Sequence, residues 1–256
     1  MRALALGVSR IGAENEPLEP EPVQTGGGKR GDETILSPCF QDSSWRTAFF
    51  VSAGDRVLFR LQLIVDRYRP IGELISLIGE GVDCVQLRIR DESTLRLVEY
   101  ASSVVEACRS SGAIALVNGR ADIALAAGAA GVQLPTHGLR PSEVKAIAPG
   151  LVIGASVHSI EEAIRAKADG ADVVTFGHVF ESGSHPHEAP RGLEMLRAVV
   201  EAIDLPVVAI GGIGPGNVER VREAGASAIA VIGSIWDAQE SERANIVRVL
   251  RKGIET

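Results

Sequence analysis

Eight short apolar runs alternate with segments of helical periodicity along most of this chain, and no other feature limits its fold as strongly. Each run has four or five residues rich in Val, Ile and Leu, which is typical of strands buried on both faces of a parallel sheet. The predicted strands are residues 61–65, 84–88, 114–118, 131–134, 152–156, 173–176, 207–210 and 228–232. The predicted helices include residues 93–110, 141–148, 160–169, 192–203 and 216–224.

Eight successive strand–helix units predict a closed (β/α)8 TIM barrel. An open, doubly wound sheet is the alternative, since periodicity alone does not distinguish the two. The length of 256 residues and the apolar fraction of 45% are sufficient for one large domain. We therefore expect a barrel domain over residues 59–256.

The first 58 residues lack this alternation. Residues 12–34 are rich in Pro, Glu and Gly, a composition that is typical of disordered segments. Residues 35–59 contain Trp45, Phe49 and Phe50, which either pack on a barrel end or belong to sequence upstream of an ancestral start. We expect a largely disordered N-terminal extension over residues 1–58.

Composition excludes several classes of partner. The formal net charge is −7 and no block of basic residues offsets it, which argues against binding of nucleic acid. No apolar stretch reaches the roughly 18 residues of a membrane span, and residues 1–9 have too short an apolar core for a signal peptide. The cysteines, Cys39, Cys84 and Cys108, lack metal-type spacing and an even-numbered framework. We predict a cytoplasmic protein with reduced thiols and no membrane partner.

Glycines follow each of the last two predicted strands. Gly211 and Gly212 come after the seventh strand, and Gly233 and Ser234 come after the eighth. Glycine lets backbone N–H groups approach an anion closely, and the loops after strands seven and eight usually bind the substrate phosphate in such barrels. We predict a phosphate site here, with a helix that begins near Pro215. For either loop alone, a purely steric need for glycine is the alternative.

Polar residues stand at the ends of other predicted strands, where the active site of a barrel lies. Arg88 and Arg90 alternate at the end of the second strand and can together bind a carboxylate or another anionic group. Surface ion pairs are the alternative for these arginines. The remaining polar residues at strand ends are Gln86, Asn118, Gln133, Ser156, His158 and His178.

His158 is the strongest catalytic candidate, because an imidazole with a pKa of about 6.5 can take up and return a proton near neutral pH. Its alternative role is to cap the next helix, although Ser159 is the more natural cap. His178 is a weaker candidate with an equal claim to a structural role. His185 and His187 lie in the following loop. A metal site with His178 is conceivable, but solvated loop histidines or a lid need no metal, so we predict none.

Six short phrases resemble the thiamin-phosphate synthase and TenI superfamily of phosphate-binding (β/α)8 proteins, and the resemblance covers about Leu61 to Trp236. The phrases are Val85-Gln-Leu-Arg88, Val117-Asn-Gly-Arg-Ala-Asp-Ile-Ala-Leu125, Gly131-Val-Gln-Leu-Pro135, Ser156-Val-His-Ser-Ile-Glu-Glu-Ala163, Phe176-Gly-His-Val-Phe180 and Val208-Ala-Ile-Gly-Gly212. The resemblance implies a phosphorylated small-molecule substrate.

The synthase branch, as the resemblance implies, binds Mg²⁺ and a pyrophosphate leaving group with an Asp after the strand-three Asn and another after strand four. Here Asn118 is followed by Gly119, and Pro135-Thr-His-Gly138 follows strand four. Arg90 stands where that branch has Lys, and Glu181-Ser-Gly-Ser-His185 replaces its Thr- and Lys-rich loop. These differences favour the TenI-like branch, the thiazole tautomerases, which need no cofactor.

The expected activity is therefore an isomerase of thiamin biosynthesis. It would convert 2-(2-carboxy-4-methylthiazol-5(2H)-ylidene)ethyl phosphate to the aromatic carboxythiazole phosphate by proton transfer through His158. We expect the phosphate at Gly211, Gly212, Gly233 and Ser234, and the carboxylate at Arg88, Arg90 or Asn118. Two alternatives stay open: a Mg²⁺-dependent thiamin-phosphate synthase, and a regulator that binds the phosphate ligand without turnover. A homodimer is the default expectation.

Overall fold

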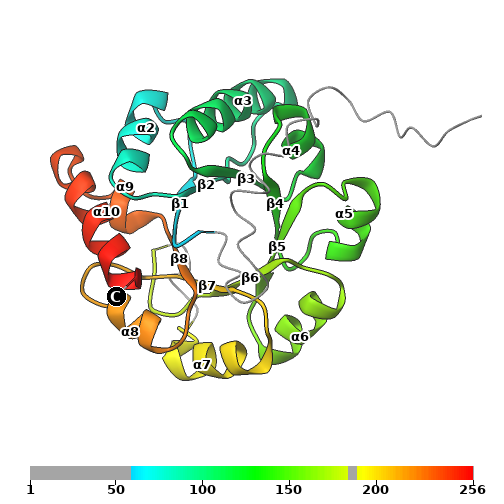
Figure 1. Cartoon of the computed structure of the whole chain (residues 1–256), viewed down its shortest axis with the longest axis vertical. Coiled ribbons are helices and arrows are strands. Elements are labelled where there is room, and N and C mark those ends of the chain that lie inside the picture. The colour runs from blue at the N-terminus through cyan, green and yellow to red at the C-terminus, as the bar shows by residue number, and fades with distance from the viewer. Residues whose placement is uncertain (1–58, 184–188, 256) are drawn as a thin grey trace, which may run out of the picture. The chain divides into compact units, whose positions relative to one another are not determined.

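A computed structural model describes residues 59–183 and 189–255 of the chain. Eight parallel strands follow one another around a closed barrel, in which β1 pairs with both β2 and β8 (Figure 1). Closure confirms the predicted (β/α)8 barrel and excludes an open sheet. The strands are β1 (Leu61–Val65), β2 (Cys84–Leu87), β3 (Ile114–Asn118), β4 (Gly131–Leu134), β5 (Val152–Val157), β6 (Val173–Gly177), β7 (Val207–Ile210) and β8 (Ala228–Val231).

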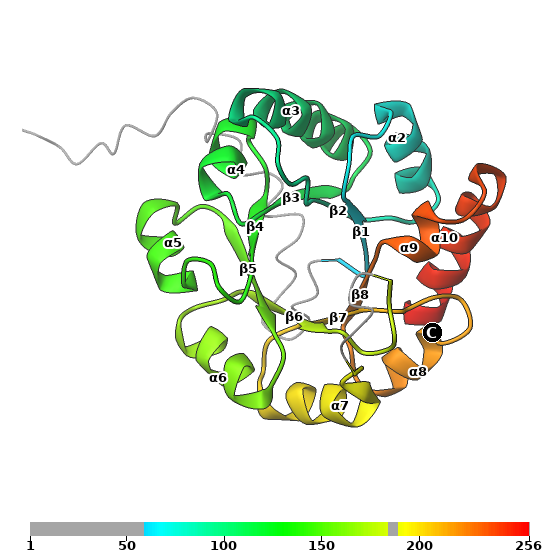
Figure 2. The same cartoon turned by 180° about the vertical axis from the view of Figure 1, so that it is seen from behind.

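Helices surround the barrel as an outer ring, which is seen from the other side in Figure 2. They are α2 (Ile71–Gly79), α3 (Thr94–Ser110), α4 (Ala121–Ala127), α5 (Pro141–Ile147), α6 (Ile160–Ala168), α7 (Gly192–Ala202), α8 (Val218–Glu223), α9 (Gly233–Trp236) and α10 (Glu240–Glu255). Local signals fix several ends. The Ser93 and Ser159 side chains accept hydrogen bonds from the first turns of α3 and α6, and Gly128 ends α4 in the left-handed conformation.

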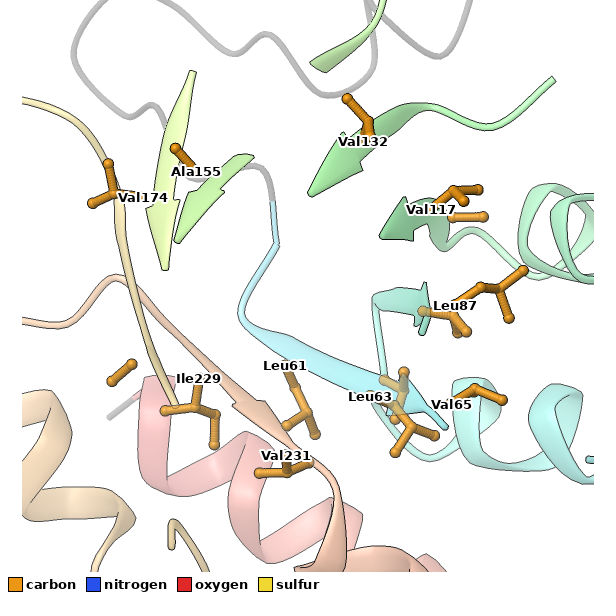
Figure 3. Close-up of a cluster of buried hydrophobic side chains, with 14 of the residues drawn as sticks. Leu61, Leu63, Val65, Leu87, Val117, Val132, Ala155, Val174, Ile229 and Val231 are labelled. Carbon is orange, nitrogen blue, oxygen red and sulfur yellow. The ribbon is translucent and has the colours of Figure 1, made fainter. Parts of the chain in front are cut away.

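Strand side chains alternate between two apolar layers. The outer layer packs between strands and helices and includes Leu61, Leu63 and Val65 of β1 together with Leu74 of α2. Figure 3 shows side chains of this layer on several strands around the barrel. The inner layer fills the barrel, and its members are Phe59, Ile64, Cys84, Ile114, Leu116, Val152, Val173, Val208, Ala228 and Ala230. Each large side chain buried in this way stabilises the fold by about 1.5–3 kcal/mol.

Some predictions fall beyond these residues. The extension predicted over residues 1–58, and the loop histidines His185 and His187, lie outside the part of the chain that the structure describes. Within residues 59–183 and 189–255, no helix is long and apolar enough to cross a membrane.

Candidate active site at the barrel mouth

Polar side chains from β1, β2 and β3 form a hydrogen-bonded row inside the barrel. The amide nitrogen of Gln62 donates to Gln86 Oε1 at 2.7 Å, and the amide nitrogen of Gln86 donates to Asn118 Oδ1 at 3.1 Å. We call these three residues the amide chain. Gln62 and Gln86 are buried, with exposed fractions of 0% and 3%, whereas Asn118 at the end of β3 is partly exposed. The amide chain therefore runs from the barrel interior to the mouth.

Strands β4, β5 and β6 carry a second polar group. The Thr175 hydroxyl donates to Gln133 Oε1 at 3.2 Å, and the amide nitrogen of Gln133 donates to Ser156 Oγ at 3.1 Å. Gly154 makes room for this group, because a Cβ there would lie 2.1 Å from Gln133 Oε1. By contrast, β7 and β8 direct apolar residues such as Val208 and Ala230 inward. The barrel interior below the mouth, which we call the floor, thus contains polar side chains from six strands, while β7 and β8 contribute apolar ones.

The polar residues predicted at strand ends included Gln86, Gln133 and Ser156. The prediction did not include Gln62 or Thr175. Both residues are polar, and both lie within otherwise apolar strands. Each has the same strand parity as its inward-facing neighbour, Ile64 for Gln62 and Val173 for Thr175. That parity was the available signal.

The arginines predicted after β2 lie at the mouth. Arg88 is half-buried and Arg90 is exposed, and neither forms an ion pair with another described residue. This observation argues against the surface ion-pair interpretation. Burial and then the neighbouring charge of Arg90 lower the pKa of Arg88, while the carboxylate of Asp66 acts in the opposite direction. Two guanidinium groups that follow the same strand and form no ion pair with a described carboxylate are suited to an anionic ligand.

A carboxylate after β1 adjoins these arginines. Asp66 lies 3.3 Å from a guanidinium nitrogen of Arg67 and 3.6 Å from one of Arg69. Burial raises the pKa of Asp66, but hydrogen bonding and positive charge from Arg67, with a further contribution from Arg69, outweigh this effect and hold the pKa below its usual value. The Arg69 guanidinium also lies over the Trp236 ring, 4.1 Å from its centroid. This carboxylate is already engaged by two arginines.

His158 follows β5 at the mouth, and its ring is held by two neighbours. Its Nδ1 lies 3.2 Å from Thr136 Oγ1 and 3.3 Å from Glu162 Oε2, and its backbone N–H donates to the same carboxylate at 2.7 Å. Ser159 is the N-cap of α6, since its side chain accepts from the Glu162 N–H. The alternative that His158 caps the helix is therefore wrong. The ring is oriented through its Nδ1 edge, by residues that the sequence alone did not indicate.

His178 has a different environment. Its exposed fraction is only 4%, and a Cβ on Gly211 would lie 2.3 Å from the His178 Cβ. The residue packs beneath the loop after β7 instead of standing free at the mouth. This position supports the structural alternative for His178.

Glycine is sterically required after β7. Gly211 and Gly212 have φ values of 104° and 64°, in the region that favours glycine. A Cβ on Gly212 would lie 2.2 Å from the carbonyl oxygen of Glu181. The steric need that we considered as an alternative is therefore present, and it coexists with the exposure of backbone donors described next.

The two glycine loops present unpaired donors. The backbone N–H groups of Gly212, Gly233 and Ser234 donate to no atom of the described residues. Gly233 and Ser234 begin α9, where the first N–H groups of a helix have no intrahelical acceptor. The Ser234 hydroxyl is buried and has no partner among the described residues. Gly211, Gly212, Gly233 and Ser234 are the residues that we predicted to bind phosphate, and we call them the phosphate cup.

The helix after β7 begins later than predicted. The prediction placed its start near Pro215, but α8 begins at Val218. The reason is Asn217, whose carboxamide accepts from the Gly214 N–H at 2.8 Å and donates to the Gly212 carbonyl at 2.8 Å. These two bonds close a turn over residues that would otherwise enter the helix, and they fix the Gly212 peptide beside the mouth.

Comparison with known proteins now identifies the family. A family model described as thiamine monophosphate synthase matches residues 61–235. The thiamine-phosphate synthase of Pyrococcus abyssi is 38% identical over 204 residues, which cover 79% of this chain and 98% of that protein. This chain belongs to the thiamine monophosphate synthase family.

Other members of the family agree. The thiamine-phosphate synthase of Anaeromyxobacter dehalogenans is 40% identical over 76% of this chain and 88% of its own length. The solved structure of a thiamine phosphate pyrophosphorylase from Pyrococcus furiosus has a TM-score of 0.71 at 36% identity and covers 77% of this chain and 96% of that chain. A 3-hexulose-6-phosphate synthase structure has a TM-score of 0.56 at 21% identity, which reflects the shared fold alone.

These relatives correct the expected activity. We expected a thiazole tautomerase, an isomerase, but relatives at 37–40% identity are named thiamine-phosphate synthases, which are transferases. The resemblance to the superfamily was right and the choice of branch was wrong. That choice depended on a few loop positions, chiefly Gly119 and residues 135–138, whereas the similarity to synthases extends over most of the barrel.

The synthase branch implies Mg²⁺, and the residues present do not fit an ion held by carboxylates. After β3 stands Gly119, whose N–H donates to the Gln133 carbonyl. After β4, residues 135–138 carry no carboxylate. Nearby, Asp66 is engaged by arginines and Glu162 by His158. Within residues 59–183 and 189–255, no group of three or more His, Cys, Asp or Glu residues could hold a metal ion.

Proposed function

We propose that this chain is a thiamine-phosphate synthase, a transferase that joins a pyrimidine pyrophosphate to a thiazole phosphate with pyrophosphate as the leaving group. The observation that carries the proposal is a mouth with two separate places for anions. One is the phosphate cup after β7 and β8, and the other is the arginine pair, Arg88 and Arg90, after β2. A reaction between two phosphorylated substrates needs two such places on one face.

The phosphate cup is suited to the monophosphate of the thiazole. The N–H groups of Gly212, Gly233 and Ser234, which are unpaired within the described part of the chain, can surround phosphate oxygens. The buried Ser234 hydroxyl, which has no partner there either, would gain one. Backbone donors have no rotamer freedom to lose on binding. The cup can therefore hold one end of the substrate rigidly while the ring lies over the floor.

The side chains after β2, β3 and β5 are suited to the pyrophosphate-bearing substrate. Arg88 and Arg90 can stabilise the charge that develops on the leaving group, as guanidinium groups do in phosphoryl chemistry. Asn118 adds an amide beside them, and the ring of His158 can hydrogen-bond a leaving-group oxygen. The positions after β3 and β4 lack the carboxylates that would hold a metal ion, so these side chains are the groups available to the leaving group there.

The test is a coupled assay with both substrates. Purified full-length chain is incubated with pyrimidine pyrophosphate and thiazole phosphate, with Mg²⁺ or with a chelator, and thiamine phosphate and pyrophosphate are measured. We expect equal amounts of both products, formed only when both substrates are present. Absence of both products, under conditions in which each substrate binds, would overturn the proposal.

A second candidate is a regulator that binds the phosphate ligand without turnover. The specific observation in its favour is the lack of carboxylates after β3 and β4, where the synthase branch binds its metal. This candidate predicts tight binding of thiazole phosphate together with no product in the same assay. The same experiment therefore separates the two candidates.

The remaining predictions from the sequence concern cellular location, oligomeric state and the N-terminal extension. We propose a cytoplasmic location, supported by the buried free thiols of Cys84 and Cys108. We also propose a homodimer and an N-terminal extension over residues 1–58. Gel filtration with light scattering, and limited proteolysis of the full chain, test these two proposals.

A further inference from the structure

The amide chain inside the barrel has a direction. A carboxamide has one acceptor end and one donor end, so each hydrogen bond in a row of amides fixes the orientation of the next. Gln62 donates to Gln86, and Gln86 donates to Asn118. The Asn118 oxygen is therefore occupied by Gln86, and its NH₂ group donates to no atom of the described residues.

The opposite direction would satisfy the same pairs of residues, so the direction needs a cause. The buried end supplies one. Gln62 has an exposed fraction of 0%, and in the observed direction its Oε1 has no partner among the residues that the structure describes. If all three amides were reversed, the Gln62 nitrogen would be left without any partner in place of the oxygen. Buried N–H groups without partners are rarer than under-satisfied oxygens, so the observed direction is preferred.

The direction decides what Asn118 presents to a ligand. In the observed direction the mouth receives an NH₂ donor, whereas the reversed chain would present a carbonyl oxygen. Asn118 ends β3, and Arg88 follows β2, the strand that pairs with β3. Both residues have the parity of the inward-facing Leu116 and Cys84. A donor amide beside a guanidinium group matches an anionic oxygen, and a carbonyl oxygen there would repel one.

We propose that Gln62 is a positioning residue which, through Gln86, holds the Asn118 amide with its donor side toward an anionic oxygen of the substrate. The identity of that substrate rests on the proposed synthase function. Gln62 itself lies too deep to touch a ligand, because it is buried beneath Gln86 in the barrel interior. Its effect must pass through the amide chain.

The direct test uses the wild-type chain without ligand. Neutron diffraction from crystals of perdeuterated protein distinguishes the ND₂ and oxygen ends of each carboxamide. We expect deuterons on the Gln62 nitrogen facing Gln86 and on the Gln86 nitrogen facing Asn118. The reversed order would overturn the proposal. This result does not depend on catalysis, so it stands or fails independently of the proposed function.

Substitution tests the consequence. Gln62→Leu removes the donor to Gln86, and Gln62→Met does so with an unbranched chain of similar length in case the leucine variant does not fold. Thr175→Val is the matched control, since it removes one buried hydrogen bond of the other polar group, whose side chains form no hydrogen bond with the Asn118 side chain. The readouts are the side-chain NH₂ resonances of Asn118 by NMR and the affinity for inorganic pyrophosphate by calorimetry.

We expect the Gln62 variants to shift or double the Asn118 resonances and to weaken pyrophosphate binding by about 3- to 10-fold, which corresponds to the loss of one net hydrogen bond. Thr175→Val should leave the Asn118 resonances in place. Unchanged Asn118 resonances in a folded Gln62 variant would contradict the proposal. Equal shifts in Thr175→Val would also contradict it, because they would indicate a general loosening of the barrel.

Discussion

The two sides of the barrel mouth that we propose as anion sites offer different parts of the chain to a ligand. After β7 and β8, the donors are backbone N–H groups of the phosphate cup, held by packing of glycines against their neighbours. After β2, β3 and β5, the groups are side chains: Arg88, Asn118 and His158. Loops after strands seven and eight frequently bind phosphate in (β/α)8 barrels, whereas side chains determine which second group is bound and what is done to it. The comparison therefore separates what is shared by the fold from what is particular to this chain.

The largest effect is expected on the backbone side. Gly212→Ala should destabilise the fold by about 2 kcal/mol or more, because Gly212 has φ 64° and its Cβ would overlap the Glu181 carbonyl oxygen. Displacement of the loop should weaken thiazole phosphate binding by about 100-fold. Thermal unfolding and calorimetric titration measure the two effects.

Gly216→Ala is the matched control for that change. It lies in the same loop, but a Cβ there would meet nothing within 4 Å, and its φ is not in the left-handed region. We expect stability and affinity within experimental error of the wild-type chain. A similar loss in both variants would mean that the loop tolerates no substitution, and it would contradict a special role for close packing at Gly212.

The next effect lies on the side-chain side. Arg88→Met should weaken binding of inorganic pyrophosphate by about 10- to 100-fold, the range for loss of a charged hydrogen bond, while thiazole phosphate binding at the cup changes little. Arg120→Met is a suitable control, because Arg120 follows β3 but is already paired with Asp122 at 2.6 Å. Equal losses of both ligands in Arg88→Met would show that the two sides are not separate.

A smaller effect is expected at His158. Glu162→Gln removes the carboxylate that lies 3.3 Å from Nδ1, so the imidazole tautomer should be less strongly fixed. We expect turnover to fall by about 3- to 10-fold, together with a change in the ring ¹⁵N shifts of His158. Glu161→Gln, one residue away on the exposed face of α6, should change neither. Unaltered ring shifts in Glu162→Gln would show that Glu162 does not fix the tautomer of His158.

The smallest effect is expected away from the mouth, and it concerns the stability of the fold. Burial raises the pKa of the Cys108 thiol to about 12, so the folded state keeps its proton where the unfolded chain loses it. The stability that the buried, protonated Cys108 thiol contributes is fully present below a pH of about 8.5, and it is lost as the pH rises toward 12. Cys108→Ala should therefore lose less stability than the wild-type chain between pH 8 and pH 10, by on the order of 1 kcal/mol, in urea unfolding. An identical pH dependence in the two proteins would contradict the burial of this thiol.

The sequence predicted the barrel well because parallel strands that are buried on both faces have continuous apolar sequences. All eight predicted strands match the structure to within one residue at either end, and runs such as Val207–Ile210 match at both ends. The loop of Gly211 and Gly212 was also predicted from the sequence, because glycine best suits a left-handed backbone that is closely packed.

The side-chain part of the mouth was less predictable because its partners come from distant parts of the chain. The link from Gln62 to Gln86 and Asn118 joins three strands, and the contact of His158 with Thr136 joins two. The helix α8 begins later than predicted because Asn217 closes a turn before it, and helical periodicity does not indicate such a turn. The branch of the family was misjudged for a related reason, since a few loop residues were given more weight than the similarity of the whole barrel.

The most direct measurement is whether the mouth holds both anions at once. Thiazole phosphate is titrated into the full-length chain by calorimetry, with and without saturating inorganic pyrophosphate. If the two sides bind their anions separately, pyrophosphate should change the affinity for thiazole phosphate by less than about 3-fold. The remaining change reflects modest charge repulsion, which salt reduces. Strict competition, in which the apparent dissociation constant rises in proportion to pyrophosphate concentration, would contradict the account.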